Sequence, residues 1–343
     1  MTRHILTLTI LLVAIRSAVA ADQINLRDGK VVLGKIQQES TTEVVIAGTA
    51  GTQTIEVSRI TEIRYDGHPA TMTQARIFEG SGNWRGAADQ YVEAQADLND
   101  KPLVLQAAQF GEARSLARLA LNESAETDKA IGRLDAFRKA HPQSRHHYPL
   151  HELLGRLYFA KNDYTQAAEA FDELAKAPWP DAQLRAALYQ GRMLKAQKKL
   201  DEALARLDKI AAAQAESAEL QLIQAEALLE KAGCFRAQNR RDQEIEALQQ
   251  ALARTPSNAN PLQAEAYIAL GDALQAAQKP KDALMAYLHV DLMFPQDKEL
   301  HARALYNLTL LWTQLGHGDR AAKTRSTLKS EYPDSSWNKK LGS

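Results

Sequence analysis

The chain of 343 residues has little of what several protein classes depend on. It has a single cysteine, Cys234, so no disulfide can form within the chain, and we expect this thiol to be a small buried apolar residue of a helical segment. Lysine and arginine together number 42, as do aspartate and glutamate. A formal net charge of zero gives no support to nucleic-acid binding. Beyond the first twenty residues no apolar run is long enough for a membrane span.

Motifs of catalysis are also missing. The sequence contains no phosphate-binding Gly-x-x-x-x-Gly-Lys, no Gly-x-Ser-x-Gly turn and no His-Glu-x-x-His zinc motif. Residues 316–321 match the glycine pattern of a dinucleotide loop, but they connect two expected helices and follow no strand. Carboxylates fall among Lys and Arg on helix faces, which is ordinary solvation. We therefore predict a protein that is not an enzyme and has no cofactor.

Four histidines lie close together in the sequence, at a turn between expected helices. Imidazoles at this density can bind Zn²⁺ or Cu²⁺. Glu152 is the one carboxylate near them at ligand spacing, so a solvated loop is the favoured interpretation and metal binding stays open. The histidines are His141, His146, His147 and His151.

The first twenty residues resemble a secretory leader in their order of charges and apolar residues. A basic start precedes the apolar run Ile5–Ile15, and the small residues Ala18 and Ala20 follow. We predict a signal peptide at residues 1–20, cleaved after Ala20, and a soluble exported protein. A short N-terminal anchor is the alternative.

Residues 21–66 have the period of β-strands. Five short runs rich in β-branched residues are separated by Gly and polar turns, which predicts a compact five-stranded barrel with Gly34 as the bend of the second strand. A linker at residues 67–70 follows. The expected strands lie at Ile24–Leu26, Val31–Ile36, Glu43–Ile46, Thr54–Val57 and Ile60–Tyr65.

This β module resembles Sm-like and SH3-like small barrels. The resemblance rests on the run Leu26-x-Asp28-Gly29-x-x-x-x-Gly34-x-Ile36 and on a closing Ile-x-x-Ile. Sm proteins bind RNA, but this module has no basic or aromatic clusters in its loops. We expect it to contact protein, or to cover the first helix of the region that follows.

The remaining sequence repeats one spacing. A Gly or Ala is followed twelve residues later by a small residue, and four residues further by a large apolar one, as in Gly271, Ala283 and Tyr287. We expect the first helix of each unit to end with the Gly or Ala where it approaches the second, with the large residue filling the gap between units. The anchor alanines recur 36 to 38 residues apart, with one interval of 80 that leaves room for a degenerate copy. They are Ala130, Ala167, Ala203, Ala283 and Ala321.

Proline twelve residues after the alanine closes three of these units, because it cannot continue a helix. The whole pattern resembles the tetratricopeptide repeat, TPR, over residues 71–335, with a tail at 336–343. The copy at 225–256 departs from it, because Glu244 replaces the small residue. The resemblance implies an α-solenoid of about six to seven helix pairs that binds a partner. The repeat endings resemble those of bacterial envelope proteins, which implies a periplasmic location.

In TPR arrays the first helix of each repeat lines a groove, so offsets from the Gly or Ala identify its residues. The middle of this groove is basic with apolar neighbours, which suits an acidic peptide or the C-terminus of a partner protein. The alternative is a solvated surface. The predicted groove residues are Glu152, Arg156, Phe159, Arg192, Lys195, Asp272, Gln275 and Tyr306.

These observations predict a non-catalytic exported scaffold that binds another protein or peptide in the cell envelope. Two alternatives stay open. One is a structural subunit of an oligomeric envelope assembly, and the other is an enzyme acting on cell-wall polymer. The sequence does not identify the partner or the oligomeric state.

Overall fold

The computed structural model describes residues 21–49, 51–256 and 258–342. The predicted signal peptide, residues 1–20, lies outside them. Two compact units are present. Among the described residues, unit 1 consists of those from 21 to 119 together with Gly132–His147, and unit 2 is Ala120–Ile131 together with those from 148 to 342.

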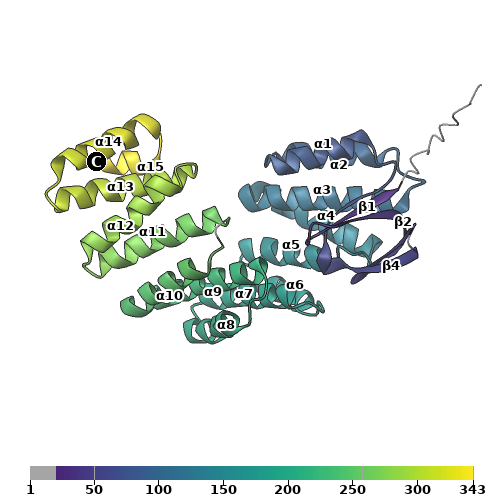
Figure 1. The fold of residues 1–343 in the computed structure, drawn as a ribbon, viewed down its shortest axis with the longest axis horizontal. Coiled ribbons are helices and arrows are strands. Elements are labelled where there is room, and N and C mark those ends of the chain that lie inside the picture. Colours follow the sequence, from purple (N-terminus) through teal and green to yellow (C-terminus); the bar gives the residue numbers. More distant parts are fainter. Residues whose placement is uncertain (1–20, 50, 257, 343) are drawn as a thin grey trace, which may run out of the picture. The chain divides into compact units, whose positions relative to one another are not determined.

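Unit 1 begins with an antiparallel sheet in the order β4-β3-β2-β1-β5 (Figure 1). The five runs expected to be strands all form strands, and the 3₁₀ turn Val57–Arg59 precedes the last one. The strands are β1 (Asp22–Leu26), β2 (Val31–Glu39), β3 (Glu43–Gly48), β4 (Gly51–Glu56) and β5 (Ile60–Arg64).

Strand β2 changes partner at the glycine predicted to bend it. Gly34 pairs with Asp22 of β1, and Lys35 pairs with Ala47 of β3. A Cβ atom on Gly34 would lie 2.3 Å from the Ala47 carbonyl oxygen, so only glycine lets the two backbones approach this closely.

The predicted barrel is wrong, because the sheet is open, with β4 and β5 at its two edges. A closed barrel fills its interior with its own side chains. Here the buried face of the sheet packs against helices instead. Ile24, Ile46 and Ile63 share one hydrophobic core with Met72 and Val104. The strands and the first helices therefore form one core, and the linker at 67–70 does not separate two.

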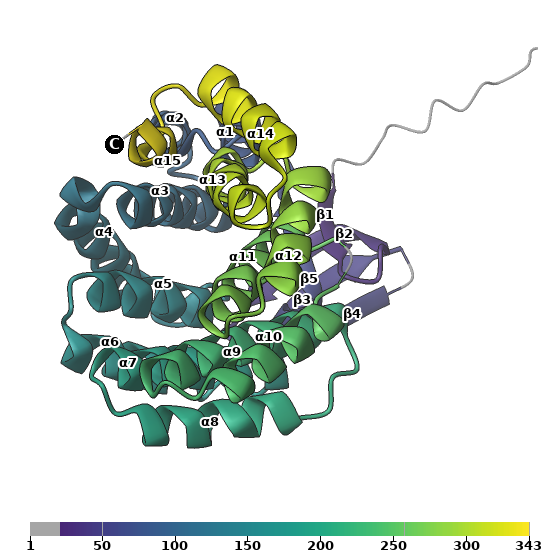
Figure 2. The same ribbon diagram turned by 90° about the vertical axis from the view of Figure 1, so that its left-hand side faces the viewer.

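The described residues beyond the sheet form seven helix pairs and one short final helix, which agrees with the predicted six to seven pairs (Figures 1 and 2). None of these helices is long and apolar enough to cross a membrane. The pairs are α1 (Ala70–Gly80) and α2 (Trp84–Gln95), α3 (Pro102–Asn122) and α4 (Thr127–Ala140), α5 (His147–Ala160) and α6 (Tyr164–Leu174), α7 (Pro180–Ala196) and α8 (Leu200–Ala212), α9 (Ala218–Ala237) and α10 (Arg241–Arg254), α11 (Asn260–Ala276) and α12 (Pro280–Met293), and α13 (Lys298–Gln314) and α14 (Gly318–Glu331). The final helix is α15 (Ser336–Gly342).

Six of the pairs use one kind of turn. Two residues after the first helix ends, the backbone adopts a left-handed conformation with φ between 58° and 79°. Such a residue reverses the polypeptide and ends the helix. Glycine is favoured there because other residues strain the backbone, yet four of the six positions are not glycine. The residues are Gly82, Asn162, Lys198, Asn239, Gln278 and Gly316.

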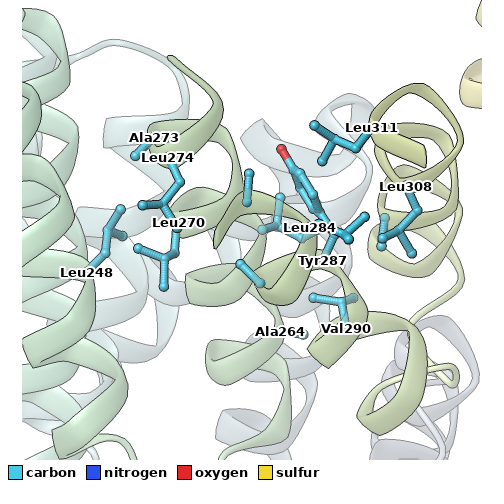
Figure 3. Packing of buried hydrophobic residues seen from close by; sticks show 14 of the residues in the cluster. Leu248, Ala264, Leu270, Ala273, Leu274, Leu284, Tyr287, Val290, Leu308 and Leu311 are labelled. Carbon is cyan, nitrogen blue, oxygen red and sulfur yellow. The ribbon is translucent and has the colours of Figure 1, made fainter. Parts of the chain in front are cut away.

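The predicted spacing marks the contact inside the pairs whose first helix has the glycine. A Cβ on Gly155 would lie 2.4 Å from the Phe171 ring, and a Cβ on Gly271 would lie 2.6 Å from the Tyr287 ring. The expectation that the first helix ends at this glycine is wrong, because the helix continues for another turn. Figure 3 shows Tyr287 between the leucines of α11 and Leu308 of α13, so the large residue also reaches the next pair.

Helix ends also follow the predicted pattern. Helices α4, α12 and α14 end two residues before Pro142, Pro295 and Pro333. The expected tail contains α15, whose Trp337 packs against Tyr306 of α13.

Candidate functional site

The first helices of the pairs in unit 2 together present one polar surface, which we call the first-helix face. Ion pairs and hydrogen bonds across it join α5 to α7, α7 to α9, and α11 to α13. All eight predicted groove residues lie on these helices. Glu152, Arg156 and Phe159 are on α5, Arg192 and Lys195 on α7, Asp272 and Gln275 on α11, and Tyr306 on α13.

Glu152 connects α5 to α7. Its carboxylate accepts a hydrogen bond of 3.0 Å from the Tyr189 hydroxyl and lies 3.8 Å from Arg185. Arg185 also donates to Glu219 of α9, at 2.8 Å. Burial, with Glu152 beside it, raises the pKa of Tyr189 to about 12, so this hydroxyl stays protonated and acts as a donor.

Arg192 and Lys195 are already paired. Arg192 donates to Glu230 at 2.8 Å and to Glu226 at 2.9 Å, and Lys195 pairs with Glu230. Burial alone would raise the pKa of Glu230, but the two cations outweigh it and hold this pKa below its ordinary value. The expected basic stripe is therefore largely neutralised by α9.

Glu226 and Glu230 are not among the predicted groove residues because they do not fall at the offsets used. Counted from Ala232 of the α9 copy, those offsets fall on Leu229, Gly233 and Arg236. A third carboxylate, Glu265 of α11, faces the same group. Its pKa is raised by burial and by the negative charges of Glu230 and Glu226. The centre of the first-helix face thus carries charges of both signs.

Arg156 differs from the other two predicted cations. Within the residues that the structure describes, no hydrogen bond or ion pair engages its guanidinium group, and its charge acts on Tyr189. Phe159, one turn further along α5, is half-buried, with its ring 5.9 Å from that of Tyr164. Arg156 is therefore the predicted cation best able to accept an acidic partner.

At the far end of the face, the predicted residues are engaged within the fold. Asp272 accepts a hydrogen bond of 2.6 Å from the Tyr287 hydroxyl and pairs with Arg303. Gln275 lies 3.5 Å from the same hydroxyl. The Tyr306 ring lies 5.4 Å from that of Trp337, so α15 covers this end.

The histidines do not form one solvated loop. His146 and His151 are buried, which contradicts that interpretation for both. The His146 ring stacks on Phe110 at 3.9 Å, and His141 lies 2.7 Å from the Gln109 side-chain oxygen. No group of three or more His, Cys, Asp or Glu side chains in the described ranges is placed to hold a metal ion. The buried His146 imidazole packs on the Phe110 ring, and a sequence pattern alone did not distinguish the two buried histidines from loop residues.

Cys234 is fully buried in α9, as predicted. Burial raises the pKa of its thiol, which keeps the group in its unreactive neutral form.

A family model described as tetratricopeptide repeat matches residues 153–182, which span the end of α5, all of α6 and the start of α7. The protein contains tetratricopeptide repeats. Beyond the matched copy, the other TPR units are recognised by their helix pairs and by the spacing that they share. No curated protein matches this sequence.

Solved structures share this TPR fold. PilW, described as a widely conserved type IV pilus biogenesis factor, is 18% identical, with a TM-score of 0.50 over 67% of this chain and 98% of its own. The apo form of RapI is 14% identical, with a TM-score of 0.58 over 78% of this chain and 77% of its own. The Cut9–Hcn1 complex of the APC/C gives 16% identity and a TM-score of 0.52, over 78% of this chain and 47% of that one. At these identities the likeness concerns the fold alone.

Proposed function

We propose that this TPR protein is a non-catalytic, exported scaffold that binds a protein or peptide of the cell envelope along the first-helix face of unit 2. The observation that carries the proposal is the alignment of α5, α7 and α9 by contacts between their polar side chains. Glu152 meets Tyr189, and Arg185 meets Glu219. A row of polar and aromatic groups on adjacent helices suits an extended or helical peptide.

Arg156 is the proposed acceptor for an acidic group of the partner, and Phe159 the adjoining apolar contact. An arginine can hold a carboxylate through two parallel hydrogen bonds. Arg192 and Lys195 play a different part from the one expected, because Glu226 and Glu230 already neutralise them. They orient the neighbouring helices and contribute little net attraction.

Export rests on the leader pattern of residues 1–20 and is tested separately. N-terminal sequencing of the mature protein should begin at Ala21. A full-length cytoplasmic product would contradict this part of the proposal without affecting the binding face.

The binding face is tested with a random peptide library displayed against the full-length protein and against an Arg156→Glu variant. We expect the wild-type protein to select peptides with an acidic group next to an apolar residue. Arg156→Glu should weaken these peptides by about tenfold, which corresponds to about 1.4 kcal/mol. Lys209→Glu is the control, because it makes the same charge change at an exposed site of the second helix α8.

Two results would contradict the proposal. One is the selection of no peptides, and the other is an equal loss of binding in the Arg156 and Lys209 variants. An equal loss would mean that only the overall charge matters. Binding should also fall as salt rises, because the contact is partly exposed.

A further inference from the structure

Unit 1 contains a pocket of about 500 Å³ that no sequence pattern indicated. Strand β5, helices α1 to α3 and the loop between α4 and α5 supply its walls. Part of the lining is apolar, with Met72, Tyr91 and Phe110, and the rest is rich in arginine. Sites for small molecules have volumes of about 300–1,000 Å³ and this kind of mixed lining. The pocket therefore has the size and the composition of a small-molecule site.

His146 is a buried polar side chain of this lining that the fold leaves without a hydrogen-bond partner. The residue is 6% exposed, and its ring stacks on that of Phe110, with the centroids 3.9 Å apart. Within the described ranges no hydrogen bond engages either ring nitrogen. The nitrogens lie at the edge of the stacked ring, and the residue lines the pocket. Buried polar groups almost always have a partner, so the partner of this imidazole has to come from the pocket.

The chemistry of His146 restricts what that partner is. Its imidazole is neutral, because burial and the charges of Arg145 and Arg114 hold its pKa well below the ordinary value. A neutral imidazole has one nitrogen that donates a hydrogen bond and one that accepts. The accepting nitrogen needs a donor on the ligand. A carboxylate group has no donor, so it would leave this nitrogen unpaired.

Two arginines of the lining offer donors to the same ligand. Arg114 donates to Glu79 through Nε and Nη2, at 2.9 and 2.7 Å, and the Nε of Arg76 lies 3.4 Å from Glu62. No hydrogen bond engages the Nη1 group of either arginine within the part of the chain that the structure describes. A guanidinium group has five N–H donors, so each arginine is fixed by its carboxylate and keeps donors for a ligand.

The other charged groups of the lining also have partners. Arg145 lies 3.3 Å from Glu39. The guanidinium carbon of Arg118 lies 5.8 Å from the Trp84 ring centre, and Arg118 interacts with further groups of the protein. A charged ligand would compete with these contacts, and breaking a buried ion pair is strongly destabilising. A neutral ligand that both donates and accepts hydrogen bonds leaves them intact.

We propose that this pocket binds a neutral sugar. Each hydroxyl of a sugar both donates and accepts, so hydroxyls on adjacent carbons can donate to His146 while they accept from Arg114 and Arg76. The groups are close enough for one ligand, because the guanidinium carbon of Arg114 lies 5.6 Å from the centre of the Phe110 ring on which His146 stacks. The apolar C–H faces of the sugar ring suit Met72 and Phe110.

A peptide amide is the nearest competitor, because it also donates and accepts. Its N–H and C=O groups point in opposite directions from one planar unit, so a single amide serves fewer of these groups than a ring of hydroxyls. The sugar has two sources, since it is either free in solution or one unit of a glycan chain. Both sources share the hydroxyls that the pocket recognises.

The test is an NMR titration of the full-length protein with a panel of sugars. The panel is glucose, galactose, mannose and N-acetylglucosamine, each as the free sugar and as its methyl glycoside. We expect at least one of them to bind saturably, and the uronic acid of the same configuration to bind at least tenfold more weakly. Binding of the free form alone identifies a free sugar, and equal or tighter binding of the methyl glycoside identifies a unit of a glycan chain.

Variants locate the binding within the pocket. His146→Phe keeps a ring against Phe110 but removes both nitrogens, and it should weaken the sugar about tenfold. His289→Phe is the control, because His289 stacks in the same way on Tyr267 of α11, outside the pocket, and this variant should have no effect.

A second variant tests the space itself. Ala107 lines the pocket, so Ala107→Leu places a larger side chain in it and should abolish measurable binding. Ala205→Leu, at an exposed position of α8, makes the same change elsewhere and should bind as the wild type does. Thermal unfolding of each variant separates a lost site from a lost fold. None of these residues belongs to the first-helix face, so the result is independent of the function proposed above.

Three binding results would overturn the assignment. They are no saturable binding of any sugar of the panel, tighter binding of the uronic acid, and equal binding of N-acetylalanine methylamide, which represents a peptide. An equal loss in the His146 and His289 variants would also overturn it, since the unpaired imidazole would then contribute nothing specific.

Discussion

Units 1 and 2 both contain helix pairs of the same kind, but different contacts hold them together. In unit 1, residues far apart in the sequence meet in one core, where Ile24 and Tyr65 of the sheet region pack with Met72 and Val104 of the helices. In unit 2, one contact between neighbouring helices recurs from pair to pair, as in Gly155 with the Phe171 ring.

The buried charges differ in the same way. In unit 1, Glu39 of β2 accepts a hydrogen bond from the Tyr65 hydroxyl and pairs with Arg145, which lies more than a hundred positions further along the sequence. In unit 2, Glu244 pairs with Arg236 and Arg241 of its own repeat. Unit 1 should therefore lose stability as a whole, whereas damage in unit 2 should reach the adjacent repeat and decline beyond it.

Arg145→Met should have the largest effect. It leaves the carboxylate of Glu39, 2% exposed, without its counter-ion. Removing one partner of a buried ion pair destabilises by about 3–5 kcal/mol. Hydrogen exchange should show lost protection in β2, β5 and α1 together, with α11 to α14 unchanged. Arg138→Met, at a surface pair, is the control and should lose less than about 1 kcal/mol. Equal losses in the two variants would show that the buried pair does not hold unit 1 together.

Ala283→Leu should come next, and its effect should stay local. Ala283 of α12 is fully buried against α11, so a larger side chain forces the two helices of the pair apart. Overpacking of this kind destabilises by about 1–3 kcal/mol. Urea unfolding measures the loss, and hydrogen exchange should place it in α11 to α14. Ala205→Leu, at an exposed position of α8, is the matched control. Unchanged stability of Ala283→Leu would mean that the repeated spacing does not mark helix contacts.

This difference between the units also explains which features the sequence predicted. Repeated contacts leave a period, so the helix pairs, the closing prolines and the position of Gly271 under Tyr287 could be predicted. Contacts between distant segments leave none. Three features were therefore found only in the structure. They are the packing of the open sheet against helices, the pairing of Arg145 with Glu39, and the arginine-lined pocket.

The candidate site was predicted in part for the same reason. The offsets placed all eight groove residues on first helices, because the repeat fixes which helix each residue belongs to. They did not reveal that Arg192 and Lys195 are paired, since the partners Glu226 and Glu230 lie at positions of α9 that the offsets do not identify. A residue's helix could be predicted from spacing, but the charge that it faces could not.

Acid should distinguish the units by the pH at which each begins to weaken. His146 of unit 1 is neutral when folded, because burial, Arg145, Arg114 and His141 all lower its pKa. The unfolded state takes up this proton below about pH 6.5, so unit 1 should lose stability as the pH falls below that value. Glu230 of unit 2 has a lowered pKa, so its contribution is full above pH 4.5 and is lost only below it.

The measurement is hydrogen exchange of both units at a series of pH values. His146→Phe removes the titrating group while keeping a ring against Phe110, and should flatten the dependence of unit 1 between about pH 7 and pH 5. Glu230→Gln should leave that range unchanged. Simultaneous weakening of both units near pH 6, with no effect of His146→Phe, would contradict the assignment.

Glu244→Ala should have the smallest effect, although Glu244 is as fully buried as Ala283. The substitution gives position 244 the alanine that the regular repeats have at the equivalent position. Its two arginine partners have 44% and 35% of their side chains exposed, so they regain water when the carboxylate is removed. No buried charge is left unpaired, and we expect a loss of about 1 kcal/mol or less by urea unfolding. The reverse change, Arg236→Met with Arg241→Met, leaves the buried carboxylate alone and should cost about 3 kcal/mol or more. If the two changes destabilise equally, packing and not the arginine partners stabilises Glu244. The ion pairs of Glu244 would then contribute less to stability than the Arg145–Glu39 pair of unit 1.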